Sequence, residues 1–137
     1  MAQPATGRRL LNVHAVPTPS APPVAGPYSP AVRAGDWLVL SGQLGLGADG
    51  ALVPGGTEAE AAQALTNLVA VLGDGGASWA DVAKVTIFLT DLGQFSRVNA
   101  LYEAALAPHR PARTTVGVAA LPGGASIEIE CWVYRPR

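Results

Sequence analysis

The chain has 137 residues, enough for one domain that buries roughly two-thirds of its unfolded surface and needs no disulfide or metal to fold. Apolar residues make up 49% of it and charged residues 14%, and the net charge of −1 argues against nucleic-acid binding through a basic face. The single cysteine, Cys131, excludes an intrachain disulfide and favours a cytoplasmic location. We expect no secretory signal, and no membrane span because every apolar run is short.

The N-terminal part of the chain predicts an extended arm. Residues 1–10 are expected to be flexible, and residues 10–16 favour a short strand. Six prolines follow between residues 16 and 30, and they exclude a helix or a central strand there. We therefore expect this stretch to lie extended over the fold.

A β-hairpin and a loop are predicted next. Residues 31–33 and 37–41 flank Gly35-Asp36, a typical hairpin turn. Residues 45–56 are rich in glycine and are interpreted as a loop. The loop matches part of a dinucleotide-binding fingerprint, but the helix and acidic partner of that site are missing, so no cofactor is expected.

A helix is predicted from Thr57. Thr57 and Glu60 match a capping box, in which the two residues satisfy free amides at the start of a helix. Apolar side chains then recur at helical spacing, and glycines at 73–76 end the helix. The stripe consists of Ala61, Ala64, Leu65, Leu68 and Leu72.

Two further strands and a second helix follow. Residues 84–90 alternate as a strand does, and residues 91–94 form a second capping signal. The apolar residues Val98, Leu101, Tyr102 and Ala105 continue a helix that prolines stop. Residues 114–120 are rich in β-branched side chains, which favour a strand.

The last strand is predicted at residues 126–134, after a turn at Gly123-Gly124. It alternates between an apolar face and a face that carries Glu128 and Glu130. The order of elements predicts an α+β domain with two helices on one face of a mixed sheet. The other face is left uncovered, and together with the low charge content this indicates a homo-oligomer.

Arg113 is the first candidate for a functional residue. It enters a strand directly after Pro111-Ala112, and its guanidinium matches a carboxylate bidentately. Glu128 lies on the following strand, so a hairpin through Gly123-Gly124 would make the two strands neighbours. The alternative is structural: an arginine at a strand entry is often a surface charge, and glutamates on a strand often form a solvated face. His14 and His109 stand alone, so no metal site is expected.

Five motifs in register resemble the RidA (YjgF) family of reactive-intermediate deaminases from about Arg9 to the C-terminus. They are Gly26-Pro27-Tyr28-Ser29-Pro30-Ala31-Val32, Ser41-Gly42-Gln43, Val98-Asn99-x-x-Tyr102, Pro111-Ala112-Arg113-Thr114 and Ile127-Glu128-Ile129-Glu130. The resemblance implies a chorismate-mutase-like fold across the single domain 1–137. It also implies a homotrimer around a central β-barrel, with sites in clefts between subunits.

The resemblance further implies hydrolysis of enamine and imine acids, such as 2-iminopropanoate and 2-iminobutanoate, to 2-keto acids and ammonia. The family arginine that binds the substrate carboxylate falls on Arg113, and the glutamate that orients the attacking water falls on Glu128. Tyr28, Ser41 and Asn99 fall on pocket positions. A small carboxylate-bearing substrate is the expected partner, with no nucleic acid, membrane or cofactor.

The sequence departs from the family where many relatives carry a cysteine, two residues after the arginine. Here that position is Thr115, which donates and accepts hydrogen bonds but forms no thiolate. Two other functions therefore stay open. One is a non-catalytic trimer that binds or senses small carboxylates, and the other is a hydrolase of a different nitrogen-containing metabolite in a catabolic pathway.

Overall fold

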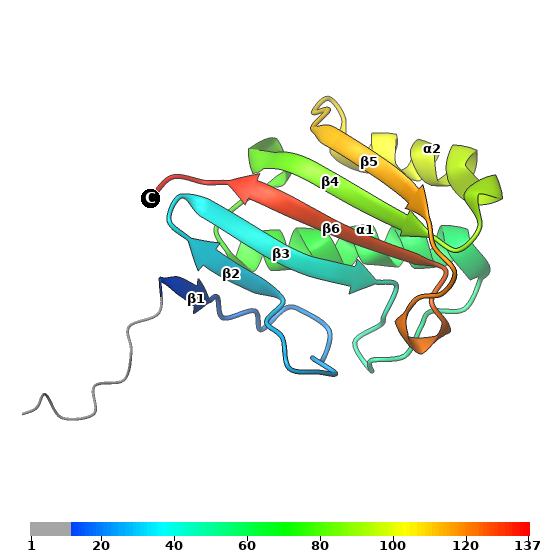
Figure 1. The fold of residues 1–137 in the computed structure, drawn as a ribbon, viewed down its shortest axis with the longest axis horizontal. Coiled ribbons are helices and arrows are strands. Elements are labelled where there is room, and N and C mark those ends of the chain that lie inside the picture. Colours follow the sequence, from blue (N-terminus) through cyan, green and yellow to red (C-terminus); the bar gives the residue numbers. More distant parts are fainter. Residues whose placement is uncertain (1–11) are drawn as a thin grey trace, which may run out of the picture.

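The computed structural model describes residues 12–137, so the flexibility expected for residues 1–10 lies outside the described part. Six strands form one mixed sheet in the order β1-β2-β3-β6-β4-β5 (Figure 1). The strands are β1 (Val13–Ala15), β2 (Ala31–Ala34), β3 (Trp37–Leu44), β4 (Val82–Leu89), β5 (Ala112–Gly117) and β6 (Ile127–Tyr134). The helices are α1 (Gly56–Asp74) and α2 (Phe95–Leu106), with short 3-10 turns at Trp79–Asp81, Leu92–Gln94 and Pro122–Gly124.

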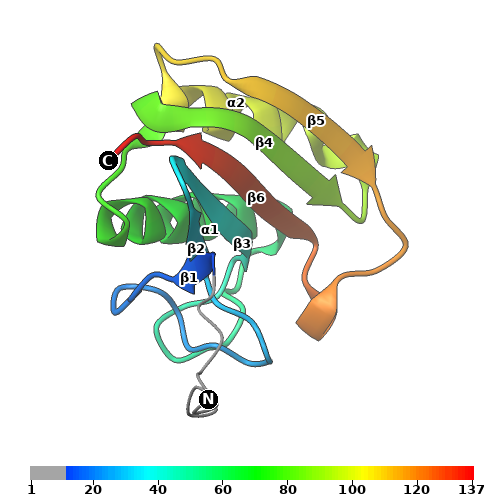
Figure 2. The ribbon, with the colours of Figure 1, turned by 60° about the vertical axis from the view of Figure 1, so that its left-hand side comes forward.

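Both helices lie on one face of the sheet, as predicted for an α+β domain. Helix α1 packs against β3 and β6, and α2 lies beside α1 under the β4–β5 side of the sheet (Figure 2). All five apolar side chains of the predicted stripe on α1 are buried, and they meet the alternating apolar residues of β4 and β6. Burial of these faces is the main stabilising contribution to the fold.

The predicted start of the first helix is wrong in its detail. Helix α1 begins at Gly56, after Gly55 in the left-handed conformation, and no side chain caps it. Thr57 therefore lies inside the first turn instead of before it. The Glu60 carboxylate accepts hydrogen bonds from the backbone amide and the hydroxyl of Ser126, both at 2.9 Å. The local pattern predicted that this carboxylate would bind the start of the helix, but it binds Ser126, 66 residues away, instead.

The hairpin predicted at Gly35-Asp36 is confirmed, but the one predicted between the last two strands is wrong. Strand β5 pairs in parallel with β4, and β6 lies between β3 and β4, antiparallel to both. The reason is that β4, α2 and β5 form a strand–helix–strand unit, whose two strands run parallel and side by side. The chain then crosses to the centre of the sheet through the turn at Pro122–Gly124.

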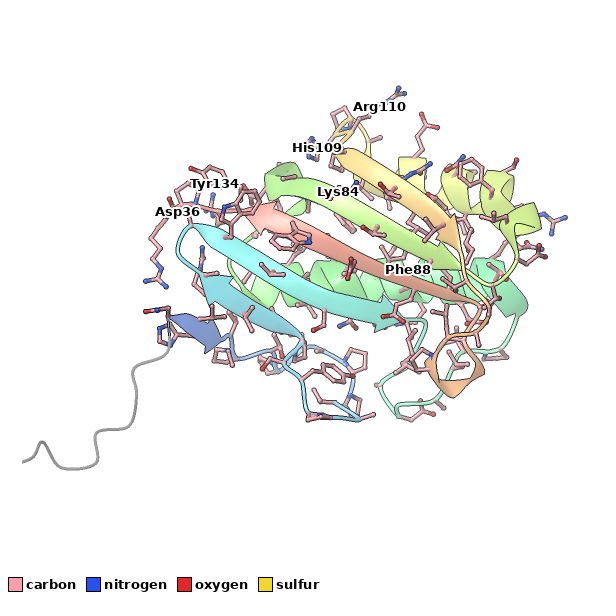
Figure 3. The ribbon with its side chains drawn as sticks, in the orientation of Figure 1. Asp36, Lys84, Phe88, His109, Arg110 and Tyr134 are labelled. Atoms are coloured by element: carbon pink, nitrogen blue, oxygen red, sulfur yellow. The ribbon has the colours of Figure 1, made fainter. Side chains whose placement is uncertain are left out.

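The face of the sheet opposite the helices is open in the single chain. Figure 3 views this face, with Lys84, Phe88 and Tyr134 labelled on it. Trp37 contacts Trp132 and Tyr134 edge to face, at ring distances of 6.3 and 5.3 Å, and all three rings are more than a third exposed. No helix within residues 12–137 is long and apolar enough to cross a membrane.

Candidate active site

Arg113 lies on the helix side of the sheet, at the edge strand β5. Its register partner on β4 is Val85, which is fully buried against the helices. Its guanidinium carbon lies 4.9 Å from the ring centroid of Tyr102 and 5.5 Å from that of Phe95, both on α2. These are cation–π distances. The two rings therefore hold the guanidinium between β5 and α2.

The charge of Arg113 has no carboxylate partner within residues 12–137. The arginines that form ion pairs there are Arg97, Arg110 and Arg135, all with side chains more than half exposed. Arg113 is only partly exposed, so its charge is more costly to leave unpaired than a fully solvated one. A ligand carboxylate would neutralise this charge and use the planar fork of donors.

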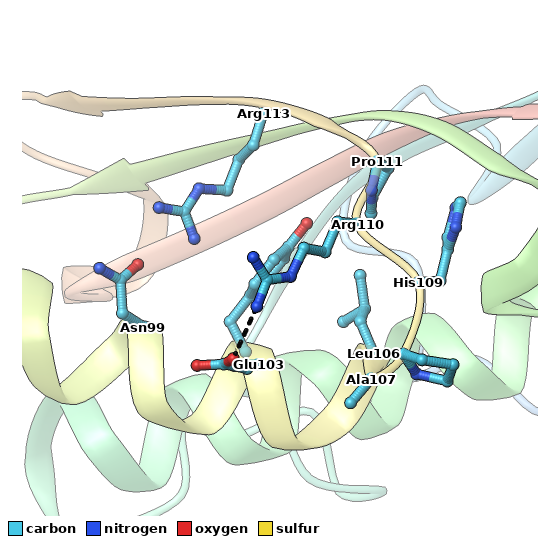
Figure 4. A pocket seen from close by; sticks show the side chains of 10 residues that line it. Asn99, Glu103, Leu106, Ala107, His109, Arg110, Pro111 and Arg113 are labelled. Carbon is cyan, nitrogen blue, oxygen red and sulfur yellow. Dashed lines mark hydrogen bonds and ion pairs between the residues drawn. The ribbon is translucent and has the colours of Figure 1, made fainter.

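A cavity of about 500 Å³ opens beside Arg113 (Figure 4). Asn99 projects into it from α2, one turn after Phe95 and one turn before Tyr102 on the same helix face. Glu103 and Arg110 pair across the cavity wall at 3.2 Å. Other lining residues are Leu106, Ala107, Pro108, His109 and Pro111. The His109 ring makes a structural contact, because its Nε2 lies within hydrogen-bond distance of the Val82 carbonyl oxygen, at 2.8 Å.

Glu128 lines a second cavity of about 300 Å³, together with Tyr28 and Ser41. The proline-rich arm and β3 supply most of its wall, which is largely apolar. The apolar residues are Pro22, Pro23, Val24, Ala25, Pro30, Leu44, Leu46 and Pro122. The extended arm predicted from the prolines thus becomes one side of a cavity.

Burial and charge both change the acidity of Glu128. Desolvation raises the pKa of its carboxyl, and the neighbouring Glu130 raises that pKa further. A glutamate whose pKa lies above its ordinary value exchanges protons more readily near neutral pH. The electrostatics of this cavity therefore suit proton transfer.

Ser41 connects β3 to the arm, which carries Tyr28. The Ser41 hydroxyl donates to the carbonyl of Ser29 at 2.6 Å, and its amide donates to the carbonyl of Pro30 at 2.9 Å. The Tyr28 side chain is half exposed at the mouth of the second cavity. Ser41 thus has a structural bond already, while the Tyr28 side chain lines the cavity and is half exposed.

Thr115 lies on the same side of the sheet as Arg113, two residues further along β5. Its hydroxyl is buried without a hydrogen-bond partner, and so is the hydroxyl of Tyr102. Thr115 lines neither of the two cavities just described. An orphaned buried hydroxyl is costly, so a partner at this position would stabilise the site.

Arg113 and Glu128 are not brought together within one chain. Arg113 faces the helices, whereas Glu128 alternates with the buried Ile127 and Ile129 and therefore faces the open side. Strand β4 separates the two strands that carry them. The predicted residues thus divide into two sets: Arg113 and Asn99 in one cavity, and Glu128, Tyr28 and Ser41 in the other.

Several contributors escaped the sequence reasoning. Phe95 and Tyr102 support Arg113, a role that sequence reasoning gave to neither, although it named Tyr102 in the second helix and in a family motif. Their helical spacing around Asn99 was the available signal. Glu60 anchors the start of β6, but its partner Ser126 is too distant in sequence to be foreseen. Gly42 lies against the Glu128 carboxylate, and no local pattern indicates that contact.

The fold and the two cavities define a small α+β domain that carries an unpaired arginine in one cavity and a partly buried glutamate in the other. The sequence model of the family described as Endoribonuclease L-PSP matches residues 18–135. A goat protein named 2-iminobutanoate/2-iminopropanoate deaminase is 45% identical over 90% of this chain and 87% of its own length.

Solved structures agree with these sequence matches. A Thermotoga maritima protein described as a putative endoribonuclease is 42% identical, with a TM-score of 0.86 over 90% of this chain and 98% of its own. The yjgF gene product of Escherichia coli is 37% identical, with a TM-score of 0.83 over 88% of this chain and 98% of its own. The chain belongs to this family, the YjgF/RidA family.

Proposed function

We propose that the protein is an imine deaminase, which hydrolyses small 2-imino acids and their enamine tautomers to 2-keto acids and ammonia. The observation that carries this function is the partly buried Arg113 guanidinium, held between two aromatic rings and without an ion-pair partner in the described chain. Relatives at 43–45% identity, from goat, cattle and mouse, are named 2-iminobutanoate/2-iminopropanoate deaminases. These names support 2-iminopropanoate and 2-iminobutanoate as the type of substrate in this proposal.

The complete site, in this proposal, lies between subunits of a homotrimer. Each chain carries one cavity with Arg113 and one with Glu128, on opposite faces of its sheet. A neighbouring chain that docks its Arg113 cavity against the Glu128 cavity would join them. The same assembly, with the sheets around a central barrel, would cover the exposed aromatic rings of the open face. Isolated chains would then be inactive.

The reaction needs little machinery, because an imine carbon next to a carboxylate is already electrophilic. Arg113 binds the substrate carboxylate and fixes the position of the imine carbon. Glu128 accepts a proton from water as the water oxygen attacks that carbon, and it returns this proton to the nitrogen, giving a carbinolamine with a hydroxyl and an amino group on one carbon. Glu128 then takes the hydroxyl proton and delivers it to the amino nitrogen, and the carbon–nitrogen bond breaks to release ammonia as the carbon–oxygen double bond of the keto acid forms.

The remaining site residues are proposed to bind and enclose the substrate. Tyr28 closes the Glu128 side, Ser41 holds the arm in place, and Asn99 hydrogen-bonds the ligand on the Arg113 side. Thr115 lines neither cavity of the single chain, so we propose that its orphaned hydroxyl contacts the ligand only in the assembled site. We propose no RNA substrate, because nine basic and ten acidic residues give the chain no net positive charge. A cytoplasmic location is proposed from the single cysteine.

The experiment compares the protein with Arg113→Ala and with Arg97→Ala, an exposed arginine on α2 that pairs with Glu58. 2-Iminobutanoate is generated in situ by an amino-acid oxidase, and release of 2-ketobutyrate above the uncatalysed rate is followed. We expect Arg113→Ala to lower kcat/KM by about 100-fold and Arg97→Ala to leave it unchanged. Undiminished turnover in Arg113→Ala would refute the assignment. Calorimetric binding of 2-ketobutyrate without imine turnover by the wild type would favour the non-catalytic alternative.

A further inference from the structure

Strand β3 contains an irregularity beside Glu128. Leu40 pairs with Cys131 of β6, but the next paired residue, Gln43, pairs with Ile129. Ser41 and Gly42 therefore stand opposite one residue, Glu130, which is the arrangement of a β-bulge. Bulges re-aim side chains and often lie next to active sites. Here the bulge contains Gly42, the residue of β3 that lies against the Glu128 side chain.

The Glu128 side chain lies directly over the α-carbon of Gly42. A β-carbon at position 42 would lie 2.0 Å from Glu128 Oε1, 2.7 Å from Cδ and 2.8 Å from Cγ. All three distances are shorter than any real non-bonded contact of a β-carbon. The Glu128 carboxylate therefore occupies the space that the β-carbon of any residue other than glycine would fill at position 42.

The backbone does not require glycine at this position. The glycines with left-handed backbone are at positions 35, 50, 55, 56, 76, 123 and 124, and Gly42 is not one of them. The backbone of position 42 thus lies outside the left-handed region that favours glycine. Contact with Glu128 is thus the constraint that the structure shows at Gly42.

We propose that Gly42 is a positioning residue of the deaminase site, which holds the Glu128 carboxylate at its working place by leaving room above the β3 backbone. The proposal rests on the proposed function, since it concerns the same glutamate. The second support of this geometry is Glu60, which binds the amide and hydroxyl of Ser126 and so fixes the backbone two residues before Glu128. Two features therefore place the Glu128 carboxylate. Glu60 fixes the start of β6, and Gly42 has no side chain in the space that the carboxylate fills.

The test is Gly42→Ala, with Gly73→Ala as the matched control. A β-carbon at Gly73 meets nothing within 4 Å, and Gly73 lies in the last turn of α1 with ordinary helical backbone. The atoms that Gly42→Ala displaces belong to the Glu128 side chain and not to the backbone, so we expect folding and assembly to be retained. We expect kcat to fall by about 100-fold, the range of general acid–base catalysis, with KM nearly unchanged because the Arg113 contact is intact. Gly73→Ala should keep the wild-type kcat.

A double-mutant cycle separates positioning from general damage. In the Glu128→Gln background, Gly42→Ala should cause no further loss, because the carboxylate it displaces is already gone. An equal loss in both backgrounds would overturn the proposal, as would a Gly42→Ala variant with wild-type kcat. If the wild type shows no imine turnover, the proposed function is wrong, and kcat cannot be used to test Gly42.

A second experiment tests the position of the Glu128 carboxylate without measuring turnover. The Glu128 carboxyl is titrated by carbon-13 NMR in the wild type and in Gly42→Ala. We expect the midpoint to change in the variant, because the burial and the Glu130 charge that raise the pKa of Glu128 both depend on where its carboxylate lies. An unchanged midpoint means that Gly42 does not position Glu128, and it overturns the proposal independently of the function.

Discussion

Arg113→Lys tests whether the shape of the guanidinium matters beyond its charge. Lysine keeps the positive charge but loses the planar fork that lies 4.9 and 5.5 Å from the rings of Tyr102 and Phe95. A bidentate carboxylate contact then becomes a single one. A hydrogen bond to a charged group contributes about 1.5–3 kcal/mol, and 1.4 kcal/mol corresponds to about tenfold in binding. The loss of one of two bonds therefore predicts a decrease in kcat/KM of roughly 10- to 150-fold.

The assay is steady-state hydrolysis of 2-iminobutanoate, with Arg97→Lys as the control. Arg97 is a solvent-exposed arginine near the start of α2, the helix that carries Phe95 and Tyr102, and its substitution by lysine keeps the surface charge. We expect the Arg97 variant to match the wild type. If Arg113→Lys also has the wild-type kcat/KM, the site recognises only a point charge. That result would refute a bidentate contact made by a guanidinium held against Phe95 and Tyr102.

Two further predictions concern carboxylates. Glu60→Ala removes two hydrogen bonds to Ser126 from a glutamate residue that is only 7% exposed. We expect it to lower the free energy of unfolding by about 2–4 kcal/mol, and Glu60→Gln to lower it less, as measured by urea denaturation at fixed protein concentration. The raised pKa of Glu128 means that the native state binds more protons than the unfolded state between the ordinary value of 4.5 and the raised one. Stability contributed by Glu128 should therefore fall as pH rises through that window, and Glu128→Gln should remove this slope. An unaltered slope would show that another group causes it.

Much of the fold was predictable because its signals are local. Alternation predicted β4 and β6, helical spacing predicted the buried stripe of α1, and the glycine turn predicted the β2–β3 hairpin. The order of elements also predicted two helices on one face of a mixed sheet. Each of these features depends on residues close together in the sequence.

The errors came from contacts between distant residues. The capping box at Thr57 is a valid local pattern, but the Glu60 carboxylate binds Ser126 across the fold. The predicted pairing of β5 with β6 overlooked the strand–helix–strand unit that joins β4 to β5. Sequence identified Arg113 and Glu128 as candidates, but it did not reveal that they face opposite sides of the sheet. That division depends on strand order, which a single sequence specifies weakly.

The central claim is that Arg113 of one subunit acts with Glu128 of another. Mixing Arg113→Ala chains with Glu128→Gln chains, after joint unfolding and refolding, tests this most directly. Each variant alone lacks one half of every site, but a mixed trimer contains interfaces where both intact residues meet. Random assembly at equal concentrations predicts recovery of about a quarter of the wild-type rate, since each intact residue is present on half of the chains. Activity of the mixture no greater than the average of the two separate variants would contradict the shared site.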